Sequence, residues 1–331
     1  MAKIAILAGE PSGDLIAAQL MTYIKTKESD IEFIGVGGPL MKQEGLKSFF
    51  DFSNLSLYGV FQVIPNIPKL IFLRYKLIKY LKKEKPDIFI GVDAPDFNFY
   101  IEKKLKQSGI TTFHYVAPSV WAWRPNRVFK IKKSTDHIFS IFPHEKVLFE
   151  KVGIQTTFVG HPLANKIPLK SNRFKYRKML KLERKDLVIA LLPGSRMGEL
   201  KAHTDILLKT AQNISEVYPD AKFLIPTTND KNVHFIKARI RNNPTKNLKL
   251  IKGKVDEILS SANIAIAASG TASLQIALHK KPMIIIYKGS WISYFIWKMV
   301  RLIPNVSLPN ILLNENFVPE MLQHKATPNL L

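Results

Sequence analysis

Short apolar runs alternate with longer stretches of helical periodicity along this chain. The runs of the first half cover residues 4–7, 32–36, 88–92, 112–116, 137–142 and 156–159. Those of the second half cover residues 188–192, 222–226, 248–251, 264–267 and 283–287. Strands that are apolar on both faces and alternate with helices are typical of parallel sheets covered on both sides. The pattern therefore predicts an α/β protein built from doubly wound sheets.

A basic stretch at residues 166–185 separates the two series of runs. It predicts two domains, residues 1–167 and residues 168–331. Each half opens with a strand, a Gly/Ser turn and a helix. We expect two doubly wound domains facing across a cleft, with ligands beyond the carboxyl ends of the strands.

Three turns follow predicted strands and open predicted helices: residues 9–14, 193–196 and 269–273. In each, glycine lets the backbone approach an anion, and the N–H groups of the helix start can point at it. Arg196 adds a guanidinium that suits a phosphate. Each turn alone is explained as well by ordinary helix capping. Three turns in one chain, one of them carrying Arg196, favour a nucleotide ligand.

Several other site classes lack their motifs. The segment Gly35-Val36-Gly37 has Leu40 where a dinucleotide fingerprint needs glycine, and Gly253-Lys254 lacks the upstream glycine of a P-loop. No HExxH or GxSxG motif occurs, and the chain has no cysteine. We expect neither a metal site nor a cofactor.

Asp93 follows the apolar run at residues 88–92. A carboxylate at the carboxyl end of a strand can take a proton from an attacking hydroxyl. The alternative is that Asp93 or Asp96 only caps the next helix, and Asp96 lies nearer to it. Asp93 is therefore the candidate general base. His114 lies inside an apolar run and is interpreted as a core histidine.

The chain carries 49 Lys and Arg against 26 Asp and Glu, a net charge of +23. Such charge attracts nucleic acid, anionic membranes or phosphorylated substrates, although a solvated lysine coat explains most of it. Residues 70–83 form a basic amphipathic pattern beside an uncharged stretch at 55–68. This helix either lies on a membrane or packs its leucines on a sheet. Core packing is expected for Trp291, Tyr294, Phe295 and Trp297.

The chain is not expected to span a membrane or to carry a signal peptide. The N-terminal apolar run is too short, and acidic residues follow it at once. The uncharged stretch at residues 258–279 contains many polar side chains and is predicted to be a strand, a turn and a helix.

Eight segments match one family, in order from residue 8 to residue 310. They are AGEPSGD (8–14), GVGGPLM (35–41), GVDAPDFN (91–98), HYVAPSVWAWRPNRVFKI (114–131), VGHP (159–162), LLPGSR (191–196), ASGTASL (268–274) and VSLPN (306–310). On these segments the chain closely resembles the lipid-A-disaccharide synthases, glycosyltransferases of Gram-negative envelope biogenesis.

The resemblance implies two Rossmann-like domains in the GT-B architecture and an inverting, metal-independent transfer. The implied donor is UDP-2,3-diacylglucosamine and the implied acceptor is 2,3-diacylglucosamine 1-phosphate. The products would be a β-1,6-linked lipid A disaccharide 1-phosphate and UDP. The family consists of peripheral membrane proteins, which implies an anionic membrane surface as partner and a location at the cytoplasmic face of the inner membrane.

The resemblance also implies roles for individual residues. Asp93 would deprotonate the acceptor 6-hydroxyl. The donor site would comprise Gly194, Ser195, Arg196, Ser269, Gly270, Thr271, Gln275 and Asn310. The acceptor side would comprise Glu10, Ser12 and Asp14.

Two departures from the family pattern stand out. Gln275 occupies a position where the family usually has a glutamate that accepts from the ribose hydroxyls. The chain also stops soon after Pro328, whereas the family usually continues into a helical tail that takes part in dimer exchange; a homodimer is one expectation. Two other functions stay open: a UDP-sugar epimerase on the same scaffold, and a nucleic-acid binder suggested only by charge. No RNA- or DNA-binding module supports the latter, so no nucleic-acid partner is expected.

Overall fold

The computed structural model describes residues 2–52, 55, 60–123 and 125–331. The chain divides into two compact units, Met1–Pro162 and Leu163–Leu331. The division falls at the start of α8 (Pro162–Lys166), just ahead of the basic stretch at residues 166–185.

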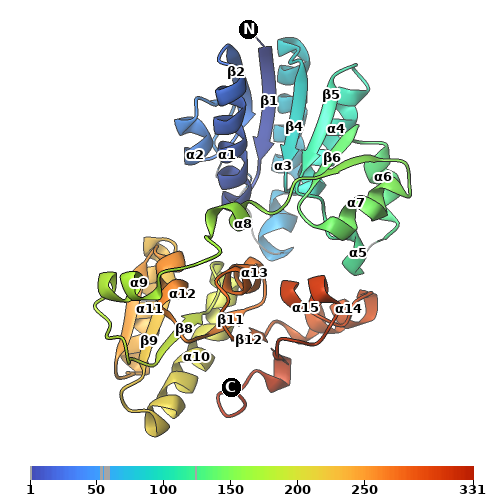
Figure 1. Cartoon of the computed structure of the whole chain (residues 1–331). Helices are drawn as coiled ribbons and strands as arrows, with labels where there is room; N and C mark the ends of the chain where they lie inside the picture. Colours follow the sequence, from blue (N-terminus) through green and yellow to red (C-terminus); the bar gives the residue numbers. More distant parts are fainter. Residues whose placement is uncertain (1, 53–54, 56–59, 124) are drawn as a thin grey trace. The chain divides into compact units, whose positions relative to one another are not determined.

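The first unit is a parallel sheet flanked by helices (Figure 1). Its elements up to residue 84 are β1 (Ala2–Ala8), α1 (Pro11–Lys27), β2 (Ile31–Val36), α2 (Pro39–Gln43), β3 (Lys47–Ser48) and α3 (Val60–Glu84). They are followed by β4 (Ile88–Val92), α4 (Pro95–Lys106), β5 (Thr111–Tyr115), α5 (Val120–Trp123), α6 (Arg127–Lys132), β6 (His137–Ser140), α7 (Pro143–Glu150) and β7 (Gln155–Phe158). The strand order is β3-β2-β1-β4-β5-β6-β7. It reverses between β1 and β4, so their carboxyl ends form the switch point where such sheets bind ligands.

Alternation along the strands builds a core on each face of this sheet. Ile4 and Ile6 of β1 pack with the helices α1 and α2. Ala5 and Leu7 point to the opposite face and pack with α3 and α4. This arrangement explains why the strands are apolar on both faces in the sequence.

The second unit repeats the same architecture. Its elements up to residue 242 are α9 (Arg173–Met179), β8 (Val188–Leu192), α10 (Met197–Val217), β9 (Lys222–Thr227) and α11 (Asp230–Asn242). They are followed by β10 (Leu248–Lys252), α12 (Val255–Ser261), β11 (Ile264–Ala268), α13 (Thr271–Leu278), β12 (Met283–Tyr287), α14 (Trp291–Val300), α15 (Leu308–Leu313), β13 (Glu320–Leu322) and the 3-10 turn η2 (Gln323–Lys325). The strand order is β10-β9-β8-β11-β12-β13, which places the switch point between β8 and β11.

The predicted fold class is confirmed, because both units are doubly wound parallel α/β structures. The uncharged stretch at residues 258–279 forms the end of α12, then β11 and α13, as predicted. No helix in the described part of the chain is long and apolar enough to cross a membrane. The sequence did not predict β3 and β13, the short strands at the sheet edges.

Candidate active site

Asp93 lies in a strained turn between β4 and α4, at the switch point of the first sheet. Its φ is 53° and that of Ala94 is 43°, a left-handed conformation that costs energy for residues other than glycine. Two hydrogen bonds hold the turn. The Asp93 N–H donates to the Tyr115 carbonyl oxygen at 2.9 Å, and the Asn98 Nδ2 donates to the Asp93 carbonyl oxygen at 2.7 Å.

A buried carboxyl group, that of Glu102, lies one helical turn beyond Asn98 and contacts His114. Glu102 and His114 have no exposed surface, and Glu102 Oε1 lies 2.7 Å from His114 Nδ1. Burial raises the pKa of Glu102. A Cβ on Gly91 would stand 2.2 Å from Glu102 Oε1, so only glycine leaves room for this carboxyl. The core position predicted for His114 is confirmed; its pairing with Glu102 was not predicted.

The turn at residues 9–14 packs against the Asp93 turn. A Cβ on Gly9 would lie 2.9 Å from the Ala94 Cβ, and one on Gly13 would lie 3.7 Å from the Asp93 Cβ. Ser12 is exposed and Glu10 is half-buried at the N-cap of α1. The structure therefore brings these two side chains to the same edge of the sheet as Asp93.

Asp14, the third residue predicted for the acceptor side, is buried. Its carboxylate accepts backbone N–H bonds from Gly38 at 2.8 Å, Met41 at 3.1 Å and Leu40 at 3.1 Å. These bonds cap α2, so the contacts that Asp14 makes here hold the GVGGPLM turn in place. A direct contact between Asp14 and a ligand stays a prediction.

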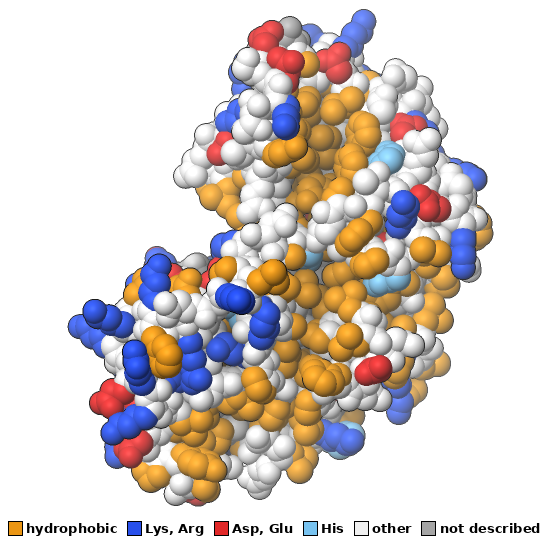
Figure 2. Space-filling view, in the orientation of Figure 1, with side chains coloured by type: hydrophobic (Ala, Val, Ile, Leu, Met, Phe, Trp, Pro, Cys, Tyr) orange, Lys and Arg blue, Asp and Glu red, His pale blue; other side chains and the backbone are white. Residues whose placement is uncertain are grey.

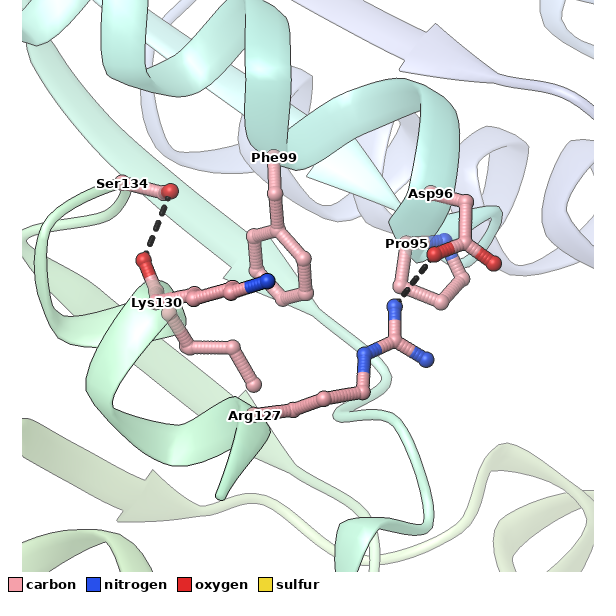
Figure 3. A pocket seen from close by; sticks show the side chains of 7 residues that line it. Pro95, Asp96, Phe99, Arg127, Lys130 and Ser134 are labelled. Carbon is pink, nitrogen blue, oxygen red and sulfur yellow. Dashed lines mark hydrogen bonds and ion pairs between the residues drawn. The ribbon is translucent and has the colours of Figure 1, made fainter. Parts of the chain in front are cut away.

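A pocket of about 370 Å³ opens beside the Asp93 turn, between α4 and α6. Figure 3 shows Arg127 pointing toward Asp96, with which it forms an ion pair. The helix-capping role considered for Asp96 is wrong, because the N-cap of α4 is Ala94 and the Asp96 carboxylate is engaged with Arg127. Arg124 of the same sequence motif lies outside the described residues.

Earlier in the segment at residues 114–131, Trp121 donates its Nε1–H to a buried carboxyl group. The acceptor is Oε1 of Glu145, at 3.3 Å, and the N–H of Phe142 donates to Glu145 Oε2 at 3.1 Å. Burial outweighs these two bonds and raises the pKa of Glu145 to about 7. The carboxyl is therefore part of the packing that supports the Trp121 segment.

In the second unit, residues 193–196 join β8 to α10 at the switch point. The backbone N–H groups of Ser195 and Arg196, expected to be open to an anion, donate instead to Glu199 Oε2 at 3.0 and 3.2 Å. A Cβ on Gly194 would lie 2.4 Å from that oxygen, so Gly194 makes room for the Glu199 carboxylate. The side chains of Ser195 and Arg196 are exposed.

His203, which the sequence reasoning missed, ties this turn to β12. Its Nδ1 lies 3.1 Å from the Pro193 carbonyl oxygen, and its Nε2 accepts from the Lys288 N–H at 2.9 Å. These partners require the neutral tautomer with the proton on Nδ1. Burial lowers the pKa of His203, which favours the same neutral form.

Residues 269–273 join β11 to α13. They lie beside the turn at residues 193–196, because Ala267 of β11 pairs with Leu192 of β8. Within the described residues, nothing accepts a hydrogen bond from the backbone N–H of Gly270 or Thr271. Gly270 has a φ of 145° and both residues are exposed. This helix start therefore offers the open N–H groups that the sequence predicted.

The VSLPN segment packs against the same turn. Ser269 Oγ donates to the Val306 carbonyl oxygen at 2.8 Å, and the Leu308 N–H donates to Ser273 Oγ at 3.2 Å. The structure thus assembles two motifs that are far apart in the sequence.

Asn310 is 1% exposed, and the contacts of its side chain are internal. Its Nδ2 donates to the Val318 carbonyl oxygen and to Glu320 Oε1, both at 2.9 Å, and its Oδ1 accepts from the Val318 N–H at 2.7 Å. Glu320 also accepts from Ser307. Asn310 therefore holds the VSLPN segment in place, and its contact with a nucleotide sugar stays a prediction.

Gln275 lies one helical turn beyond Thr271 and is half-buried. Its Nε2 donates to Asp256 Oδ1 at 2.6 Å. The His279 ring nitrogen lies 3.2 Å from the same oxygen, and Lys166 pairs with Asp256 Oδ2 at 2.8 Å. Because a carboxylate only accepts, the Gln275 amide nitrogen must face Asp256, which leaves Oε1 as the acceptor available to a ligand. Hydrogen bonding, chiefly to His279, holds the pKa of Asp256 well below its usual range.

Apolar side chains are exposed on two helices. On α3, Leu77 and Leu81 are buried against the sheet, while Phe72 and Tyr75 are exposed. Leu77 and Leu81 thus pack in the core, whereas Phe72 and Tyr75 of the same helix face solvent. The core packing expected for the aromatic group of α14 is wrong for Trp291 and Phe295, whose exposed fractions are 66% and 63%.

Some basic side chains gather on helices that carry no predicted site residue. Figure 2 shows Lys and Arg side chains over α9 and α11 of the second unit. Neither helix carries a predicted site residue, so this part of the net charge belongs to a solvated surface. In the part of the chain that the structure describes, no group of three or more His, Asp or Glu side chains is arranged to hold a metal ion.

The sequence model of a family described as lipid-A-disaccharide synthetase matches residues 4–331. The lipid-A-disaccharide synthase of Idiomarina loihiensis is 42% identical over 326 residues, covering 98% of this chain and 86% of the relative. That of Pseudomonas aeruginosa strain UCBPP-PA14 is 41% identical over 329 residues, covering 99% and 87%. The chain belongs to the lipid-A-disaccharide synthetase family. It is therefore a glycosyltransferase that acts in the formation of the lipid A disaccharide, which confirms the resemblance seen in the sequence.

Solved structures share the fold of this family member at low sequence identity. The UDP-GlcNAc 2-epimerase of Neisseria meningitidis, bound to UDP-GlcNAc, has a TM-score of 0.60 and 14% identity, covering 95% of this chain and 90% of that one. The epimerase of Methanocaldococcus jannaschii has a TM-score of 0.55 and 15% identity, covering 86% and 83%. At such identities the likeness concerns the fold alone. It therefore does not favour an epimerase function for this chain over that of the lipid-A-disaccharide synthetase family, to which it belongs.

Proposed function

We propose that this chain transfers 2,3-diacylglucosamine from its UDP derivative to the 6-hydroxyl of 2,3-diacylglucosamine 1-phosphate, with inversion, and that Asp93 is the general base. The observation that carries the proposal is the position of Asp93. It lies at the switch point of the first sheet, in a turn held in a left-handed conformation. Such strain persists where the surrounding structure fixes a functional geometry.

The chemistry that the Asp93 carboxylate would supply is the removal of one proton. As the acceptor oxygen bonds to the anomeric carbon, the bond from that carbon to the UDP oxygen breaks. The hydroxyl proton passes to Asp93, and the electron pair leaves with the diphosphate. Attack opposite the leaving group inverts the anomeric centre and gives the β-1,6 linkage.

The second unit would bind the UDP part of the donor. The open N–H groups of Gly270 and Thr271 begin α13, where the helix dipole favours a diphosphate. The exposed Arg196 would add a permanent positive charge from the neighbouring turn. Because Glu199 already accepts from the Ser195 and Arg196 N–H groups, the guanidinium is the part of this turn that would neutralise the departing charge. These groups would serve in place of a metal ion.

The Oε1 of Gln275 would accept a hydrogen bond from a ribose hydroxyl. This contact would lack the charge of a carboxylate and would therefore be weaker than a charge-assisted one. Asp256, held by His279 and Lys166, would fix the orientation of the amide.

A peripheral position at an anionic membrane is also proposed. On α3 the exposed Phe72 and Tyr75 accompany Lys76 and Lys79, and apolar side chains flanked by cations suit a membrane interface. The expected location is the cytoplasmic face of the inner membrane. A homodimer stays a prediction.

The test of this function is a UDP-release assay with defined acyl-glucosamine substrates. We expect UDP release to require the acylated acceptor, to continue in excess EDTA, and to give a β-1,6-linked product by NMR. Release of UDP at the same rate without an acceptor would point to hydrolysis or epimerisation instead. Abolition of turnover by EDTA would contradict the metal-independent mechanism.

A further inference from the structure

The pocket between α4 and α6 gathers cations directly beside the turn that carries Asp93. It is lined by Pro95, Asp96 and Phe99 from α4, by Arg127, Lys130 and Ile131 from α6, and by Ser134 from the turn after α6. Pro95 and Asp96 follow the Asp93-Ala94 turn without a break in the chain. Whatever binds here therefore contacts the start of α4, whose first residues are continuous with the candidate base.

The charges in this pocket are not balanced. Among the described residues, Lys130 makes no ion pair with any carboxylate. In the same part of the chain, Asp96 is the one carboxylate that pairs with Arg127. Arg74 does not line the pocket, but its guanidinium lies close by and donates to the Asp96 carbonyl oxygen at 3.4 Å. The pocket thus presents more positive than negative charge to an incoming ligand.

The Asp96 carboxylate is a weak partner for Arg127. Its side chain is 85% exposed, whereas that of Arg127 is 20% exposed. An ion pair with so exposed a carboxylate contributes little to stability. A phosphate monoester carries more negative charge and more acceptor oxygens than a carboxylate. Such a group can replace Asp96 on the two outer nitrogens of the guanidinium, which Figure 3 shows turned toward the Asp96 side of the pocket.

We propose that this pocket binds the phosphate group of the acceptor, with Arg127 and Lys130 as ligands and Asp96 as the internal group that the phosphate displaces. The inference rests on the proposed function, because it assigns a subsite to the phosphorylated acceptor. Phosphate binding at Arg127 releases Asp96 and fixes the position of the first turn of α4. This turn also contains Asn98, which donates to the Asp93 carbonyl oxygen. The same contact therefore selects a phosphorylated sugar and orients the turn that holds the base.

The test compares two acceptors, 2,3-diacylglucosamine with and without its 1-phosphate, in the UDP-release assay. Arg127→Ala should raise the KM for the phosphorylated acceptor by about 10- to 100-fold, the range for loss of a hydrogen bond to a charged group. It should leave unchanged the KM for the unphosphorylated acceptor and for the UDP-sugar. Lys130→Ala should act in the same direction with a smaller effect, and Lys133→Ala, an exposed lysine at the end of α6 outside the pocket, should have none.

Asp96→Asn distinguishes a displaced group from a structural one. Because it removes the carboxylate that competes for Arg127, it should lower the KM for the phosphorylated acceptor by about two- to fivefold, the range of an exposed ion pair. In the Arg127→Ala background the same substitution should have no effect on KM.

Three results would overturn the subsite. The first is an equal rise in KM for both acceptors with Arg127→Ala. The second is a rise in the KM for the phosphorylated acceptor with Asp96→Asn. The third is that Arg127→Ala loses binding to phosphatidylglycerol vesicles without any change in the KM for either acceptor. The last would assign the pocket to a lipid headgroup. If the wild-type enzyme used neither acceptor, the proposed function itself would fail, and the subsite with it.

Discussion

The buried Glu145 should make the first unit less stable as the pH rises. Its carboxyl has a pKa of about 7 in the folded chain, against 4.5 ordinarily. The folded chain therefore binds this proton more tightly than the unfolded chain, and between these two values unfolding releases it. The contribution of Glu145 to stability is most favourable below pH 4.5 and declines as the pH rises through 7.

The magnitude follows from the two pKa values. A shift of this size corresponds to about 3.4 kcal/mol in full. Between pH 5 and pH 8 the linkage relation gives a loss of about 2.5 kcal/mol in the free energy of unfolding. Glu145→Gln removes the ionisation but also leaves one of the two donors, Trp121 or Phe142, without its acceptor. That costs about 1–3 kcal/mol at every pH, so the diagnostic quantity is the pH dependence and not the level.

The assay is urea denaturation at several values between pH 5 and pH 8, followed by tryptophan fluorescence. The substitutions W291F/W297F would restrict the signal to the first unit, since Trp291 and Trp297 lie in the second. Glu150→Gln on the same helix is the matched control, because Glu150 is exposed. The stability of Glu145→Gln relative to wild type should rise by about 2.5 kcal/mol over this range. A change below about 0.5 kcal/mol, or an equal change in the control, would refute the reasoning.

Two further predictions concern the second unit. His203→Ala leaves the Pro193 carbonyl oxygen and the Lys288 N–H without their partner. It should destabilise this unit by about 2–4 kcal/mol, measured by denaturation, and raise the KM for the UDP-sugar, measured by steady-state kinetics. An unchanged KM would show that this histidine does not support the donor site. Gln275→Glu places a second carboxylate against Asp256 Oδ1 and should cost about 1–3 kcal/mol of stability at pH 8, with recovery in the Gln275→Glu/Asp256→Asn double variant. A destabilisation that the second substitution does not relieve would show that the two side chains do not interact.

The fold was predictable because its signal is local. Each central strand is an apolar run bounded by turn residues, and the predicted runs at residues 88–92, 188–192 and 283–287 coincide with β4, β8 and β12. The edge strands β3 and β13 are only two or three residues long, so they leave no periodic pattern. They exist because a neighbouring strand offers them hydrogen bonds.

The partners of the predicted site residues were less accessible to sequence reasoning. Glu199 was readable in principle, since it stands three residues after Arg196 at a helix start, where an acid accepts from the first N–H groups. The pairing of Glu102 with His114 joins a helix to the neighbouring strand, and Asn310 meets Glu320 across a loop. Such contacts depend on the tertiary packing, and no local sequence pattern predicts which of these residues will pair.

The most direct test of the central claim is the rate of transfer by Asp93→Asn. Asparagine keeps the size and the backbone contacts of the turn but cannot accept the hydroxyl proton. The substitution should lower kcat by at least ~10² and leave the affinity for UDP unchanged, because the proposed donor contacts lie in the second unit. Turnover within a few-fold of wild type, with both substrates saturating, would contradict the assignment of Asp93 as the base.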